Sequence, residues 1–412
     1  MPTWMKSAPG VWDSIPEDEA GERAGQLRTL ASRLVMGTPL DWPIGLLVLM
    51  IPVTLWASFD VRFSFPKLIG LLLGIAVFYM TVAYVCDRKR LAHVVVVYFC
   101  VGVGVASLGL VGTNWLYKYP LLSEITLSLP RLPIGLAGAP QGFHPNQVAG
   151  VLLWFVPVQL VLLLWFGQHG RFLTRQGIAI CLSSLLTTST LILTQSRSAW
   201  LGLAIGLAVL GAWANRRARV AVALAVMAVL ALLAWKGPGW AGEALFADST
   251  SQVPSTLSWR FRLEVWRAAL WGIRDFPLTG MGLGTFRRVA RALYLLTIMP
   301  GYDIAHAHNG FLQAGVDFGL PGLVAYTSIW ILLGALFVSS ARQAQGWLRA
   351  LAMGLGGSLL SSFVYNLTDT VALGAKPGPA WWMMLALVVS TFRLAKAREE
   401  GGMLEQPEHA DW

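Results

Sequence analysis

Histidine and arginine side chains are the groups of this sequence that are best placed to do chemistry. His308 lies directly before a long apolar segment, in the run Asp303-Ile-Ala-His-Ala-His-Asn309. We expect a helix to begin at about Asn309, and the positive N-terminus of a helix favours a neutral imidazole that can accept a proton from a hydroxyl group. His308 is therefore a candidate general base, and the alternative interpretation is a histidine that only caps the helix.

A polar stripe follows His308 along the same segment. Asn309, Gln313 and Asp317 are spaced four residues apart, so they share one face of an otherwise apolar helix. We expect these side chains, with His306, to support a site that contains His308. Pro321 is expected to kink the helix.

Arg262 is the arginine whose position is hardest to explain by exposure to solvent. A helix is expected over 258–276, and one stripe of it is solvated. That stripe is formed by Arg260, Arg267 and Arg274. Arg262 projects instead with apolar side chains, namely Trp259, Leu263, Trp266, Ala269, Leu270 and Ile273. A guanidinium group on such a face must meet an anion or a dense set of acceptors.

Three further arginines are candidates for binding an anion. Arg197 follows Gln195 in a tight turn between two apolar segments, where an arginine either faces a partner or reaches out to the lipid headgroups. Arg287 and Arg288 follow the glycine-rich run 280–284, which predicts a turn whose backbone amides lie near an anion. No strand–helix unit surrounds this run, so a nucleotide-binding fold is excluded.

Metal and cofactor sites are weakly indicated. Asp303, His306 and His308 could hold a metal ion, but their spacing is a poor match to known metal sites. No dense carboxylate cluster suits Mg²⁺, and the three cysteines lack metal-binding or disulfide spacing. We therefore expect neither a metal nor a cofactor. Asn146, next to His144-Pro145 at the start of an apolar segment, and Asp369 are weaker candidates for substrate binding.

The amino-acid composition indicates that these residues lie in or between membrane helices. Of the 412 residues, 56% are apolar and only 13% are charged, about half the charged fraction of a soluble domain. These values exclude a soluble enzyme and extensive disorder. Ten segments are apolar and long enough to approach the span of a membrane helix. They lie near 42–58, 66–86, 91–111, 146–166, 174–193, 198–214, 218–236, 310–338, 347–367 and 379–395.

Charge predicts how these helices are oriented. With the N-terminus in the cytoplasm, more than half of the 31 Lys and Arg residues fall in cytoplasmic segments, as the positive-inside rule requires. This basic excess therefore does not indicate nucleic acid. The expected organisation is a cytoplasmic N-terminal segment with an amphipathic helix (1–41), a membrane bundle (42–236), a large periplasmic loop (237–308), C-terminal membrane helices (309–396) and a cytoplasmic tail (397–412).

Several runs between about residues 140 and 330 together resemble the O-antigen ligase family, within the superfamily shared with O-antigen polymerases. The matching runs are Phe143-His-Pro-Asn-Gln-Val-Ala, Ser196-Arg-Ser-Ala-Trp-Leu-Gly-Leu, Arg262-Leu-Glu-Val-Trp266, Pro277-Leu-Thr-Gly-Met-Gly-Leu-Gly-Thr-Phe286, His308-Asn-Gly-Phe-Leu-Gln313 and Gly319-Leu-Pro-Gly-Leu. Each run alone is unspecific, whereas the combination is specific. Where the family often has Glu after the His-Asn motif, this chain has Asp317, which puts a direct role for this carboxylate in doubt.

The resemblance implies an all-α polytopic membrane protein with about 10–12 transmembrane helices, similar to GT-C glycosyltransferases, in the bacterial inner membrane. It implies metal-independent transfer of a glycan from undecaprenyl diphosphate to a lipid A–core-type acceptor in lipopolysaccharide biosynthesis, on the periplasmic side. Carried over by motif, His308 is the catalytic base and Arg197, Arg262 and Arg287 or Arg288 bind the diphosphate. Membrane lipid is the only other partner expected.

Three other functions compete with the ligase. A polymerase that extends the same glycan would share every motif and differ only in its acceptor. A transporter of a lipid-linked sugar would be expected to show inverted repeats and a site at the middle of the membrane, which the sequence does not indicate. A structural membrane protein would leave Arg197, Arg262 and His308 without a role.

Overall fold

The computed structural model describes residues 37–130, 142–236, 255–298 and 304–401, and within these ranges every regular element is a helix. The helices are α2 (Asp41–Trp56), α3 (Val61–Tyr84), α4 (Arg88–Gly112), α5 (Pro120–Ser128), α6 (Pro145–Leu152), α7 (Val156–Gln168), α8 (Arg175–Leu193), α9 (Arg197–Ala214), α10 (Arg216–Lys236), α12 (Ser255–Asp275), α13 (Phe286–Leu293), α14 (Gly310–Gln343), α15 (Gly346–Asn366) and α16 (Gly378–Gly401). The expected all-α polytopic membrane protein is confirmed.

Fewer helices than the expected 10–12 satisfy the length and hydropathy of a membrane span within the described residues. Eight helices in the described ranges are long and apolar enough to cross a membrane, and α6 with α7 forms a ninth span if a bend of 41° between them is allowed. Each of the ten expected segments contains a helix. However, α2 has only 16 residues, about 24 Å of helix against a hydrocarbon core of about 30 Å. The expected amphipathic helix near 27–40 falls largely outside the described residues.

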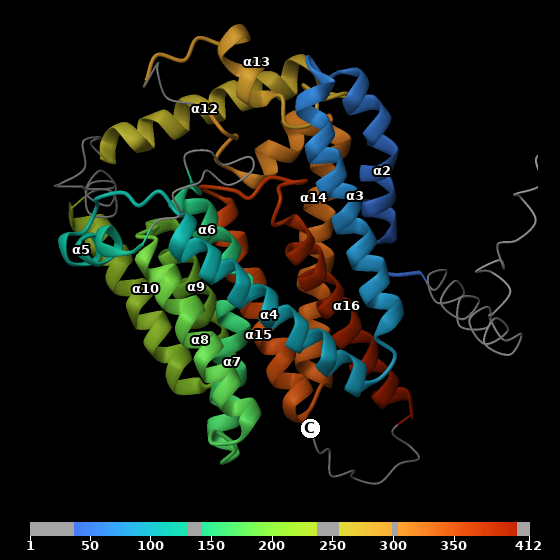
Figure 1. Cartoon of the computed structure of the whole chain (residues 1–412), viewed down its shortest axis with the longest axis vertical. Coiled ribbons are helices and arrows are strands. Elements are labelled where there is room, and N and C mark those ends of the chain that lie inside the picture. Colours follow the sequence, from blue (N-terminus) through green and yellow to red (C-terminus); the bar gives the residue numbers. More distant parts are fainter. Residues whose placement is uncertain (1–36, 131–141, 237–254, 299–303, 402–412) are drawn as a thin grey trace, which may run out of the picture.

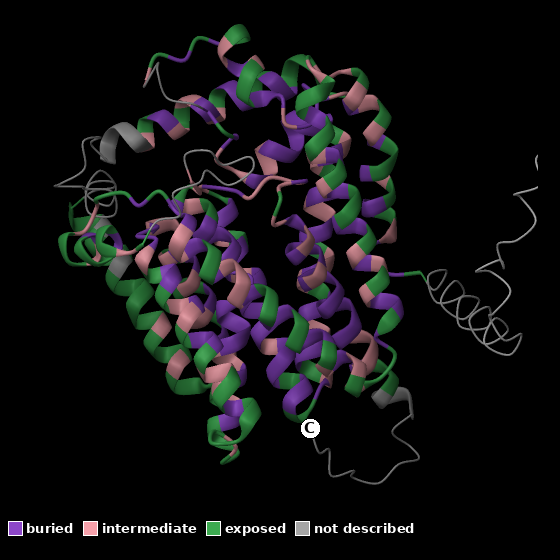
Figure 2. Ribbon diagram, in the orientation of Figure 1, coloured by how far each residue is buried: buried purple, intermediate pink, exposed green. Residues whose placement is uncertain are grey.

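The centre of the bundle is α15, which packs against α7, α9, α14 and α16 (Figure 1). Its contact with α9 depends on glycine, because a Cβ on Gly206 would collide with Ser361. Buried side chains concentrate on these inner helices, while α10 is exposed along its length (Figure 2). An apolar helix exposed in this way is expected to face lipid.

Two helices cover one end of the bundle. Figure 1 shows α12 lying across the bundle at the end opposite that at which α16 ends, with α13 beyond it. The buried face of α12 is formed by Phe261, Val265, Ala268, Ala269 and Ile273. The expected apolar face was wrong in part, because Leu263 is 40% exposed and Leu270 is 55% exposed. The buried face of α12 therefore includes Phe261, Val265 and Ala268 in place of Leu263 and Leu270.

A break at Gly319 divides α14 into a short first part and a long second part. The backbone of Gly319 has φ 69° and ψ −164°, a conformation that is essentially restricted to glycine. The next residue, Leu320, donates its N–H to the Pro277 carbonyl at 2.6 Å. The expected kink at Pro321 therefore occurs two residues earlier, where glycine permits the close approach of the segment after α12.

Replacing Gly319 by alanine is expected to destabilise the fold. The new Cβ would lie 2.6 Å from the Pro277 oxygen, and the backbone conformation itself costs about 1–3 kcal/mol for a residue with a side chain. Gly334→Ala is the matched control in the same helix, since a Cβ there has no atom within 4 Å. Thermal unfolding of the two variants should show a lower Tm for Gly319→Ala only. Equal Tm values would contradict the constraint assigned to Gly319.

Candidate functional site

A buried carboxylate brings four distant segments together. Asp369, which is 2% exposed, follows α15 and accepts a hydrogen bond from Asn146 Nδ2 at 3.0 Å. Arg262 Nη2 lies 4.0 Å from its Oδ2, and His306 Nε2 and His308 Nδ1 lie 3.5 Å and 3.4 Å from its Oδ1. We call these five residues the Asp369 cluster. The cluster contains both arginine and histidine, so it combines an anion-binding group with a potential base.

The backbone around Asp369 fixes the position of its carboxylate. Its N–H donates to the Tyr365 carbonyl at 2.9 Å, which extends the last turn of α15. Thr370 N–H donates to Asp369 Oδ1 at 2.9 Å. The Tyr365 hydroxyl donates to the Asn146 carbonyl at 2.7 Å and so ties α15 to the start of α6. The carboxylate is thereby held before any substrate arrives.

His308 is held in a strained backbone conformation at the start of α14. Its φ is 49°, in the left-handed region that residues other than glycine rarely adopt. Trp266 Nε1 donates to its carbonyl at 3.2 Å, and its own N–H donates to His306 Nδ1 at 3.2 Å. Strain of this kind persists only where the surroundings impose it, and it is frequent at functional sites.

One ring nitrogen of His308 is available to accept a proton. Its Nδ1 faces Asp369, and the rings of His306 and His308 lie 4.4 Å apart between centroids. Within the described residues neither ring nitrogen of His308 makes a well-aligned hydrogen bond, and both are buried. A proton on Nδ1, facing the carboxylate, leaves the lone pair of Nε2 available.

The histidines and the carboxylate perturb one another. Burial by itself raises the pKa of Asp369, but the contact with the His308 ring, together with the nearby charges of His306 and Arg262, holds it well below its usual range. Burial, with the charge of His308, lowers the pKa of His306 to about 3. Burial also lowers the pKa of His144. The cluster therefore contains an ionised carboxylate and a neutral His306 at neutral pH.

A metal ion is one possible occupant of these groups. His306, His308 and Asp369 offer ligand atoms within 4.8 Å of one another. However, His306 Nδ1 accepts the His308 N–H, so its proton is on Nε2, the nitrogen that faces Asp369. This tautomer fits a hydrogen-bonded pair better than a metal ligand. The alternative metal site that includes Asp303 falls outside the described residues.

The polar stripe on α14 has structural partners. Asn309 caps the helix, accepting from Phe311 N–H at 2.9 Å, and its Nδ2 donates to the Leu367 carbonyl at 3.1 Å. Gln313 Oε1 accepts from Ala307 N–H at 2.7 Å, and its Nε2 donates to Asp317 Oδ1 at 2.9 Å. These bonds join the segment that carries His308 to α14.

Asp317 holds the glycine-rich turn 280–285. Gly284 N–H donates to its Oδ1 at 2.9 Å, and the N–H groups of Gly280, Met281 and Thr285 donate to backbone carbonyls. The expectation that the amides of this turn face an anion is therefore wrong for these four residues. The glycines of this turn allow its backbone to pack closely against neighbouring segments, since a Cβ on Gly282 would lie 2.5 Å from Ser58 Cα.

Arg287 and Arg288 follow this turn in α13. The guanidinium of Arg288 lies over the ring of Phe63, 4.9 Å from its centroid. Arg287 lies within electrostatic reach of Lys67, and Lys67 in turn acts on His306.

Arg197 and Gln195 belong to a neighbouring group of residues. Gln195 has φ 54°, the only other positive φ among the non-glycine residues that the structure describes. Its Oε1 accepts from Tyr119 N–H at 2.8 Å, and its carbonyl accepts from Lys118 Nζ at 3.3 Å. The charge of Lys118 also reaches His144, so this group adjoins the Asp369 cluster.

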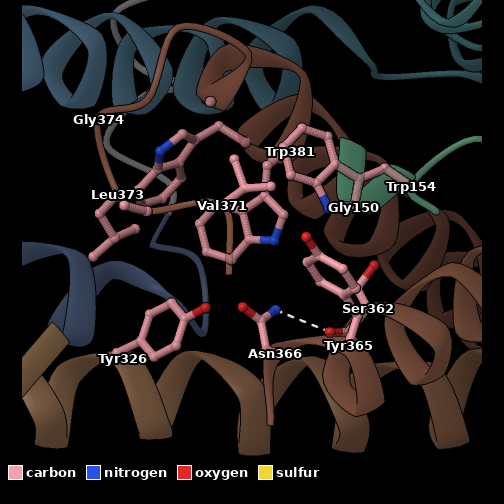
Figure 3. A pocket seen from close by; sticks show the side chains of 13 residues that line it. Gly150, Trp154, Tyr326, Ser362, Tyr365, Asn366, Val371, Leu373, Gly374 and Trp381 are labelled. Atoms are coloured by element: carbon pink, nitrogen blue, oxygen red, sulfur yellow. Dashed lines mark hydrogen bonds between the residues drawn. The ribbon is translucent and has the colours of Figure 1, made fainter. Parts of the chain in front are cut away.

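An aromatic-lined cavity lies beside the cluster. The rings of Tyr326, Tyr365 and Trp381 turn toward one space, with Asn366 between the two tyrosines (Figure 3). Asn366 Nδ2 donates to the Ser362 carbonyl at 2.9 Å, while the Ser362 hydroxyl is buried and makes no hydrogen bond in the described residues. Because Tyr365 also contacts Asn146, the cavity and the cluster share a wall.

Sequence reasoning underrated Asp369. It was only a weak candidate, although it is the single acidic residue between Asp317 and Glu399. An isolated carboxylate at the end of an apolar segment is costly to bury and is expected to have a partner. That signal was present, but the partners lie more than 60 residues away in the chain.

The low pKa of His306 predicts that acid destabilises the fold. An unfolded chain takes up a proton on this histidine below about pH 6.5, whereas the folded chain does so only near 3. Stability should therefore fall by about 1.4 kcal/mol for each pH unit below 6.5. His306→Gln should flatten the dependence of Tm on pH between 7 and 4.5.

His169→Gln is the control for this measurement, because it changes an exposed histidine at the end of α7. Its pH dependence should match that of the wild type. An unchanged slope in His306→Gln would contradict a buried neutral His306.

The comparison with known protein families gives one match. Residues 182–327 match the family model described as O-Antigen ligase. The matched range contains Arg197, Arg262 and His308, and it ends before Asp369. No curated protein matches the chain.

Proposed function

Residues 182–327 match the O-antigen ligase family model, and from this match we propose that the chain is a member of this family that transfers a glycan from undecaprenyl diphosphate to a lipid A–core-type acceptor. The family supports a membrane glycosyltransferase of the ligase or polymerase type. The observation that carries the finer proposal is the pairing of His308 with the buried Asp369, beside Arg262.

His308 is proposed to act as the general base. Asp369 faces Nδ1, so Nε2 takes the proton of the acceptor hydroxyl while the acceptor oxygen forms a bond to C1 of the donor sugar. The bond between C1 and the phosphate oxygen breaks, and undecaprenyl diphosphate leaves with the electron pair. Asp369 then stabilises the imidazolium that forms.

Arginine side chains are proposed to stabilise the charge on the leaving diphosphate. Arg262 projects from α12 into the cluster, and it can form forked hydrogen bonds to phosphate oxygens. The resemblance assigns the same role to Arg197, at the start of α9, and to Arg287 or Arg288, in α13. Electrostatic stabilisation of a leaving group often contributes more to the rate than any other effect, and it needs no metal.

The location of the site is also a proposal. The bias of Lys and Arg toward one set of loops favours cytoplasmic termini in an inner-membrane protein. The helices α12 and α13, at the opposite end of the bundle from the end of α16, would then lie in the periplasm. A donor whose polyprenyl chain stays in the membrane could reach the Asp369 cluster from that side.

Variants of His308 and Arg262 should lose glycan transfer. His308→Asn tolerates a positive φ but cannot act as the base, so kcat should fall at least about 100-fold. Arg262→Gln should fall by a comparable factor, because a charge-assisted contact to the diphosphate is removed. Transfer is measured with purified protein, a glycan on a polyprenyl diphosphate, and lipid A–core or a second glycan as acceptor.

Two matched substitutions control for folding. His169→Gln and Arg260→Gln change exposed residues, the latter in the same helix as Arg262, and both should transfer at the wild-type rate. EDTA should leave the wild type active. Near-normal glycan transfer by His308→Asn would show that His308 is not the general base. Transfer to a second glycan in place of lipid A–core would show that the protein is a polymerase.

A further inference from the structure

Lys67 is a cation of α3 that the reaction described above does not use. A Cβ on Gly284 would lie 3.1 Å from Lys67 Cγ, so the glycine leaves the space through which the lysine side chain passes. A Cβ on Gly374 would collide with the Lys67 carbonyl oxygen. Both glycines have positive φ, 73° and 74°. The turn before α13 thus leaves space for the Lys67 side chain, and the loop after Asp369 packs closely against the Lys67 backbone.

No described residue neutralises this lysine. The Lys67 ammonium has no carboxylate within 4.0 Å and makes no hydrogen bond in the described part of the chain. The nearest acidic group that acts on it is Asp317. Asp317 Oδ1 already accepts from Gly284 N–H and Gln313 Nε2. A partly buried ammonium without a partner costs free energy, which a bound anion would offset.

Two other cationic side chains lie within electrostatic reach of Lys67. Arg287 from α13 and Lys376 from the loop that follows Asp369 both act electrostatically on Lys67. Lys67 is therefore influenced by two positive charges and by one carboxylate that is already hydrogen-bonded. The charge of Lys67 also reaches His306, so this group of cations adjoins the Asp369 cluster.

We propose that Lys67 binds a phosphate group of a polyprenyl diphosphate, and that Arg287 and Lys376 complete this cationic site. The proposal rests on the proposed function, because it assigns part of the donor to residues outside the Asp369 cluster. Lysine suits this role as a compact charge with three donors, while Arg262 holds the other phosphate from the cluster. The two phosphates would then lie along a line from Lys67 toward His308.

The test is binding of a labelled polyprenyl diphosphate to the full-length protein in lipid nanodiscs. Lys67→Met keeps the length of the side chain and its contact with Gly284, but it removes the charge. The Kd should increase about 10- to 100-fold. The Tm should not decrease, since an unpaired cation is removed. Arg62→Gln, at an exposed position on the first turn of α3, is the control and should bind as the wild type does.

Each alternative outcome has a defined meaning. Equal binding by Lys67→Met would overturn the proposal, and so would a lower Tm, which would make Lys67 a structural partner of Asp317. Competition by phosphatidylglycerol as effective as that by polyprenyl diphosphate would identify a site for membrane headgroups instead. If the wild type neither binds the diphosphate nor transfers glycan, the proposed function itself fails. If it does both and Lys67→Met binds normally, only the role of Lys67 fails.

Discussion

The buried charge of Asp369 is the constraint on which the site depends. Removing a carboxylate from water costs several kcal/mol unless cations and hydrogen-bond donors surround it. Arg262, His306, His308 and Asn146 provide that compensation from three separate segments. The packing of α12, α14, α15 and α6 must therefore be correct before the carboxylate can stay ionised, which couples the geometry of the site to the assembly of the bundle.

Glycine and left-handed backbone determine how closely these segments approach. The break at Gly319 lets the first part of α14 turn toward the segment after α12, and Asp317 on that part holds the glycine-rich turn. His308 itself has a positive φ without being glycine. The strain at His308 is thus supported by the capping of α14 and by Trp266, and the catalytic proposal gives a reason why this strain is retained.

Positive charge is distributed in two ways in this protein. Most Lys and Arg residues fall in the loops that the positive-inside rule places in the cytoplasm. The cations near the Asp369 cluster are different, because Arg262 contacts a buried carboxylate and Lys67 lies between glycines of two other segments. A substrate with two phosphates would add negative charge where the protein has an excess of positive charge.

The sequence by itself determined the class of the protein and the positions of its helices. Apolar segments identify membrane helices because their signal is local, and every expected segment contains a helix. The importance of His308 and Arg262 was also visible, since His308 directly precedes a long apolar segment and Arg262 interrupts an apolar helix face. These inferences need only the composition of one short stretch at a time.

Only the tertiary structure decided which of these residues meet. It identified Asp369 as the common partner, placed Arg288 over Phe63, and showed that amides of the glycine-rich turn donate to Asp317 and to backbone carbonyls. It also showed which residues of α12 are buried and that the break in α14 lies at Gly319. Contacts between distant segments depend on the packing of whole helices, so no local pattern around Asp369 could reveal partners more than 60 residues away.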